Sequence, residues 1–123
     1  MNAFTPTTDY GYGTGTNMIR PARDVEYDVF SRVTRMLRQA EPSGTSPATI
    51  GAVHKNNELW TILAADLADP ANGLPDQVKA GLLSLAGFSV RHGHEVISGR
   101  AATDVLVEIN MSVMKGLRGG AAA

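Results

Sequence analysis

The sequence predicts an all-α protein, a small bundle of about four helices that follows a disordered N-terminal segment. Apolar residues recur at helical spacing in four stretches, and prolines or glycines separate these stretches. No stretch shows the alternation of apolar and polar residues that indicates a half-buried β-strand. At 123 residues, the chain has the length of one domain.

The N-terminal segment, residues 1–19, is rich in Thr, Gly and Tyr and offers little apolar surface to bury. Because burial has to offset the entropy that ordering costs, we expect this segment to be disordered. Residues 20–118 are expected to form a single helical domain. The glycine- and alanine-rich residues 119–123 are expected to fray.

The first predicted helix begins at Pro21, since proline is favoured in a first helical turn, and ends near Glu41, before Pro42. Its apolar residues form one stripe with Phe30 at the edge, which predicts one buried face. The stripe consists of Val25, Val29, Val33, Met36, Leu37 and Ala40.

The second predicted helix begins at Ser46-Pro47, an N-cap followed by a first-turn proline, and ends at Asp69-Pro70. Leu59 and Ile62 lie well off its main stripe, so more than half of its circumference is apolar. A helix of this kind is buried on two sides or contacts a partner. The main stripe consists of Ile50, Val53, Trp60, Leu63 and Leu67.

The third predicted helix begins at Pro75 and stops at Gly99. It carries two apolar stripes about 100° apart, the angle that one helical residue subtends, which predicts neighbours on two sides. The first stripe contains Val78, Leu82, Leu85 and Val96, and the second contains Leu83, Val90 and Ile97.

The fourth predicted helix begins near Ala102. Its main stripe contains Val105, Leu106, Ile109, Val113 and Leu117. Val107, Met111 and Met114 form a second apolar face. Such second faces either complete a four-helix core or form an exposed groove for an amphipathic partner helix, in which methionines adapt to different ligands.

Composition and charge exclude several classes of function. With no cysteine, the chain has no disulfide framework, thiolate metal site or thiol nucleophile. A net charge of −1, with acids placed among the arginines of the first helix, argues against a dedicated nucleic-acid binder. No apolar run is long enough to span a membrane and no signal peptide is recognisable, so we expect a cytoplasmic protein.

The histidines do not indicate a metal or cofactor site. His92 and His94 point to different sides of a helix, so they cannot share a metal ion, and His54 lies in another helix. No Ser, His and acid combination stands out as a catalytic set. We therefore expect no cofactor, no metal and no enzyme activity.

Three parts of the sequence resemble the FlaF family of flagellar biosynthesis regulators. Residues 57–68 resemble the family's signature helix, and 69–75 resemble the turn that follows it. Residues 106–118 resemble its C-terminal helix, and 27–30 resemble its first helix. The likeness covers about residues 20–118 and leaves out 1–19.

This resemblance implies a non-enzymatic role in flagellum biogenesis, with flagellin as partner and the translational regulator FlbT as a further candidate. The protein would act as a cytoplasmic chaperone or export adaptor that promotes flagellin synthesis or secretion. The alternatives are regulation of flagellin mRNA, directly or through FlbT, and a structural role in a larger assembly. The apolar faces, not the resemblance, suggest the contact residues: Trp60, Ile62, Phe88, Val107, Met111 and Met114.

Overall fold

The structure, a computed structural model, describes residues 15–42 and 45–118, with side chains described from Tyr27 to Leu117. Within these ranges the chain forms four α-helices and no β-strand, which confirms the predicted all-α class. The helices are α1 (Gly15–Gln39), α2 (Pro47–Ala68), α3 (Asp76–Ile97) and α4 (Asp104–Arg118). The predicted disorder of residues 1–14 and fraying of 119–123 lie outside the described residues.

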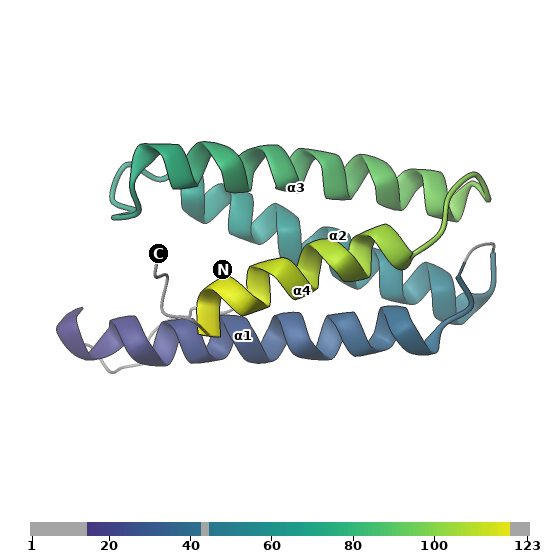
Figure 1. The fold of residues 1–123 in the computed structure, drawn as a ribbon, viewed down its shortest axis with the longest axis horizontal. Coiled ribbons are helices and arrows are strands. Elements are labelled where there is room, and N and C mark those ends of the chain that lie inside the picture. The colour runs from purple at the N-terminus through teal and green to yellow at the C-terminus, as the bar shows by residue number, and fades with distance from the viewer. Residues whose placement is uncertain (1–14, 43–44, 119–123) are drawn as a thin grey trace.

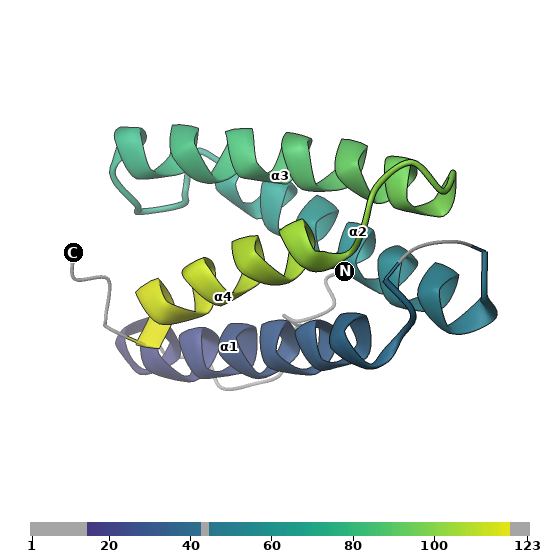
Figure 2. The same cartoon turned by 45° about the vertical axis from the view of Figure 1, so that its right-hand side comes forward.

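Successive helices run antiparallel and form an open bundle (Figure 1). Figures 1 and 2 place α1 and α3 at opposite edges, with α4 crossing obliquely in front and α2 behind. The most extensive packing joins α2 to α3 and α1 to α4, whereas α3 packs on α4 over a much smaller area. α2 packs against both α1 and α3, so its broad apolar surface is covered on two sides. Burial on two sides was one of the two alternatives that the sequence left open for this helix.

Trp60 of α2 occupies the centre of the core. It is fully buried, and its ring meets Phe30 of α1 edge to face, with centroids 5.5 Å apart and an interplanar angle of 83°. This edge-to-face geometry is one that aromatic pairs prefer. Fully buried apolar side chains from all four helices belong to one core cluster, which holds the bundle together: Trp60, Phe30, Leu37, Leu106, Val53 and Val96.

A buried chain of hydrogen bonds links α2 to α4. Trp60 Nε1 donates to Asn110 Oδ1 over 2.9 Å, and Asn110 Nδ2 donates to Asn56 Oδ1 over 2.8 Å. Both asparagines are fully buried. Since a buried polar group without a partner costs about 1–3 kcal/mol, these bonds favour one placement of α4 across α2.

The helix ends show which local signals determined the structure. Ser46 is the N-cap of α2 and Asp69 its C-cap, as predicted. Gly99 has a φ of +80°, the left-handed conformation that favours glycine after a helix. Pro75 is the N-cap of α3 rather than its first residue, and α4 begins at Asp104 rather than near Ala102.

The predicted start of the first helix at Pro21 is wrong. α1 begins at Gly15, so residues 15–19, assigned to the N-terminal segment by the sequence, belong to this helix. Pro21 lies inside α1, where its missing N–H leaves the carbonyl of Asn17 without the usual i→i−4 partner. Proline's preference for a first turn therefore did not fix the helix start.

Three residues of the predicted buried stripes are exposed instead: Met36, Val78 and Leu83. On α3 the fully buried face is built from smaller residues, Ala86, Ser89 and Gly93, followed by Val96. Gly93 lies directly against α2, because a Cβ atom at this position would come within 2.7 Å of Asn57 Oδ1 and 3.0 Å of Val53 Cγ1. Close approach of the two helices, rather than large apolar side chains, defines this interface.

The N-cap of α2 provides a local test of stability. Ser46 Oγ accepts a hydrogen bond from the Thr49 backbone N–H over 3.1 Å. Replacing Ser46 with alanine should lower the free energy of unfolding by about 1 kcal/mol, whereas aspartate, also a good N-cap, should retain most of it. Urea denaturation followed by circular dichroism measures both changes. Equal stability of the alanine variant and the wild type would show that the cap contributes nothing.

Candidate partner-binding surface

Two of the six predicted contact residues belong to the core. Trp60 is 0% exposed and Met114 is 7% exposed. Trp60 fills the centre of the bundle, and Met114 belongs to the same core cluster. Because both side chains are buried, neither is accessible to a partner. The second apolar faces of α2 and α4 are partly needed to fill the core of so small a bundle.

Phe88 and Ile62 lie on α3 and α2, whereas Val107 and Met111 lie on α4. Phe88 of α3 is 42% exposed, and its ring stacks on that of His92 with centroids 5.6 Å apart. His92 Nε2 lies 3.0 Å from the carbonyl oxygen of Ala102, in the connection to α4. Ile62 is half-buried on α2. Phe88 therefore packs on a side chain held at the α3–α4 turn.

Val107 and Met111 form a pair on α4, because residues four apart lie on the same helix face. Val107 is half-buried and packs against the core, whereas Met111 is exposed. Arg38 of α1 reaches this pair, since its Nη2 lies 3.6 Å from Met111 Sδ. The pair thus lies at the boundary between the first and last helices.

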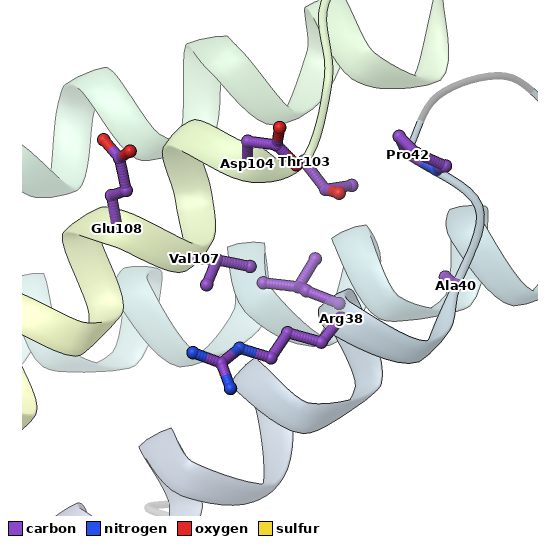
Figure 3. Close-up of a pocket in the computed structure, with 8 residues that line it drawn as sticks. Arg38, Ala40, Pro42, Thr103, Asp104, Val107 and Glu108 are labelled. Atoms are coloured by element: carbon purple, nitrogen blue, oxygen red, sulfur yellow. The ribbon is translucent and has the colours of Figure 1, made fainter.

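A pocket of about 350 Å³ opens beside Val107, between the end of α1 and the start of α4. In Figure 3, Val107 lies in the middle of the pocket, Arg38 lies on the α1 side, and Asp104 and Glu108 project from α4. The Thr103 backbone N–H donates to the Pro42 carbonyl over 2.8 Å, which joins the two connecting segments at one end. We call this site the α1–α4 pocket; its lining residues are Leu37, Arg38, Ala40, Pro42, Thr103, Asp104, Val107 and Glu108.

The sequence interpretation included Val107 and Met111 but missed the charged residues of the pocket. Asp104 and Glu108 were visible as an i, i+4 pair of acids interleaved with the apolar pair. Arg38 lies off the apolar stripe of the first helix, so the apolar pattern did not single it out. No sequence signal connected residues 37–42 with residues 103–108, because only the packing of α1 on α4 brings them together.

The titratable residues offer no further site among the described side chains. No group of three His, Asp or Glu residues in this part of the chain could hold a metal ion. The pKa of the Glu95 carboxyl lies below its usual value because Arg100 donates hydrogen bonds to it, with Nε 2.9 Å from Oε1. Both side chains are exposed and lie near the end of α3, so this ion pair links the last turn of the helix to the residues that follow it.

The fold and the pocket together define a small helical bundle with a mixed apolar and charged interhelical site on its surface. None of its described helices combines the length and the apolar character needed to cross a membrane. A family model described as flagellar protein FlaF matches residues 9–117. The chain belongs to the FlaF family. No curated protein and no solved structure matches it.

The family match extends the similarity that the sequence motifs indicated. It begins at residue 9, whereas the motifs indicated a start at about residue 20, and it ends at 117 rather than 118. Part of the glycine-rich N-terminal segment therefore lies within the family region, contrary to the expectation that residues 1–19 fall outside it. The motif-based boundary was too narrow because this segment has no apolar periodicity to align.

Proposed function

We propose that this FlaF-family protein binds flagellin in the cytoplasm as a chaperone or export adaptor. By covering an aggregation-prone segment of flagellin, it would keep flagellin competent for export and so promote its synthesis or secretion, working alongside FlbT. The observation that carries the proposal is the match to the flagellar protein family over residues 9–117. No catalytic step is part of this role.

Surface chemistry supports a binding role. Several large apolar side chains remain exposed on a domain of this small size: Met36, Val78, Leu83, Phe88 and Met111. The α1–α4 pocket adds a depression with both apolar and charged walls, and its Arg38 also contacts Met111. Amphipathic helices bind such surfaces by inserting apolar side chains, and the affinity comes from the apolar area removed from water.

Isothermal titration calorimetry with purified monomeric flagellin tests the proposal. We expect saturable binding with a Kd of about 1 μM or tighter, which corresponds to roughly −8 kcal/mol. Light scattering of the free protein, run in parallel, separates this binding from self-association into a larger assembly. The absence of heat at high micromolar concentrations of both proteins would contradict direct binding of flagellin.

Titration of the purified protein with flagellin mRNA tests the alternative, direct regulation of that mRNA. Binding of the flagellin mRNA would weaken steeply with salt, because phosphate contacts release counterions. We expect no saturable RNA binding at physiological salt, in keeping with the net charge of −1. Salt-sensitive RNA binding together with absent flagellin binding would replace the chaperone proposal with an RNA-level role.

A further inference from the structure

The α1–α4 pocket combines an apolar floor with walls of opposite charge. Val107 lies half-buried at its centre, and Leu37, which also lines the pocket, is fully buried. Arg38 supplies positive charge from α1, while Asp104 and Glu108 supply negative charge from α4. A volume of about 350 Å³ is at the lower end of the range for ligand pockets, roughly 300–1,000 Å³, and suits an inserted side chain.

The two acids of this wall are exposed and carry no ion pair among the described side chains. Asp104 and Glu108 are four residues apart on one helix face, where like charges repel each other. The ion pairs among the described side chains are Lys55–Glu58 and Glu95–Arg100, so neither acid takes part in one. Asp104 lies in the first turn of α4, where the helix dipole favours an acid, but Glu108 lies one turn further on.

A cation from outside would offset this repulsion. A basic side chain placed between Asp104 and Glu108 would interact with both carboxylates at once, one helical turn apart. The neighbouring apolar surface continues along the same helix from Val107 to the exposed Met111, four residues later. The surface therefore offers apolar contacts in a row, with acidic charge beside them.

We propose that the α1–α4 pocket docks an amphipathic helical segment of a partner protein. The segment packs an apolar side chain on the half-buried Val107, packs a second one on Met111, and sets a basic side chain against Asp104 and Glu108. Arg38 closes the opposite wall and selects against a second basic side chain there. The proposal rests on the proposed function in that flagellin is the expected source of the segment.

A pair of charge variants tests the acidic wall. Asp104→Asn combined with Glu108→Gln removes both charges from the pocket. The matched control, Asp76→Asn combined with Glu58→Gln, makes the same chemical changes in the first turn of α3 and on exposed α2. Both double variants keep side-chain volume, and circular dichroism establishes that both remain folded.

The probes are monomeric flagellin and two synthetic amphipathic helical peptides that share a leucine stripe. One peptide carries lysines beside the stripe and the other carries glutamates. Fluorescence anisotropy should give the lysine peptide an affinity about tenfold higher than the glutamate peptide, as charge complementarity fixes specificity. The pocket variant should lose about this factor for the lysine peptide and for flagellin, whereas the control variant should lose none.

A second pair of variants tests the apolar floor. Val107→Ala should weaken both probes, while Val105→Ala, a half-buried valine on the same helix that does not line the pocket, should leave binding unchanged. Equal effects of the two substitutions would overturn the assignment of the floor. A dimer of the free protein that Val107→Ala dissociates would make a second copy the occupant and would also overturn the proposal.

The outcomes separate this proposal from the proposed function. If the wild type binds flagellin and no pocket variant changes the affinity, flagellin binding stands and the pocket assignment is wrong. If the wild type does not bind flagellin, the chaperone role is refuted. The relative affinities of the lysine and glutamate peptides then still test the proposed docking chemistry of the pocket. If the two peptides bind equally well, or the pocket double variant binds like the control, the charge argument is refuted.

Discussion

Replacement of Trp60 with alanine should unfold the protein or reduce its stability by about 3–5 kcal/mol, the cost of removing a large buried aromatic side chain. Trp60 is fully buried, packs edge to face on Phe30, and donates to Asn110. Since single domains have total stabilities of about 5–15 kcal/mol, such a loss removes a large share of the folded population. Urea denaturation followed by circular dichroism at 222 nm, a far-ultraviolet helix signal, measures it.

The Trp60→Phe variant separates packing from hydrogen bonding. Phenylalanine keeps an aromatic ring against Phe30 but has no N–H group for Asn110 Oδ1. Leaving this buried acceptor unpaired should cost about 1–3 kcal/mol in addition to the volume lost. If the alanine variant were as stable as the phenylalanine variant, the central position of Trp60 in the core would be wrong.

Gly93→Ala should destabilise the bundle by about 1–3 kcal/mol, the typical cost of overpacking a well-filled interface. The new methyl group would lie 2.7 Å from Asn57 Oδ1 and 3.0 Å from Val53 Cγ1, so α2 and α3 would have to separate or Asn57 would have to turn away. Val53 is fully buried and has little room to move. Thermal unfolding should show a lower midpoint and unchanged helicity at low temperature.

Gly81→Ala on the same helix is the matched control for this substitution. No atom outside the neighbouring backbone lies within 4 Å of a Cβ built at Gly81. Alanine should therefore stabilise the helix by up to about 1 kcal/mol, the difference in helix propensity between glycine and alanine. Opposite signs for the two variants would establish close packing at Gly93, whereas a stabilising Gly93→Ala would contradict it.

The sequence predicted the limits of α2 well because the signals at its ends are local. Ser46 caps the helix with its own hydroxyl, Pro47 suits the first turn, and Asp69-Pro70 ends it. Such signals depend on neighbouring residues alone. The start of α1 shows the limit of this reasoning, since Pro21 lies within a helix that the local pattern would have begun there.

The buried face of α3 could not be predicted from apolar periodicity. The large residues Val78 and Leu83 are exposed, whereas Ser89 and Gly93 are buried against neighbouring helices. Small residues carry little hydrophobic signal, although they allow two helices to approach closely. Which face of α3 is buried therefore depends on where α2 lies, and this is a property of the whole fold.

The candidate site was predicted only in part for the same reason. An apolar pattern cannot distinguish Trp60 from Met111 as contact residues, yet Trp60 is fully buried and Met111 is exposed. Val107 and Met111 were recognised as a second face of the last helix. Arg38 and Pro42, which complete the pocket, lie far from Val107 in sequence, at the end of α1 and just after it.

This distance along the chain has a consequence for the timing of synthesis. The two halves of the α1–α4 pocket, residues 37–42 and 103–108, are separated by the whole of α2 and α3. During translation, which proceeds from the N-terminus, the first half emerges from the ribosome well before the second. A nascent chain that lacks α4 would expose Leu37 without its cover. Release of the last helix would therefore complete the core and create the pocket in the same step.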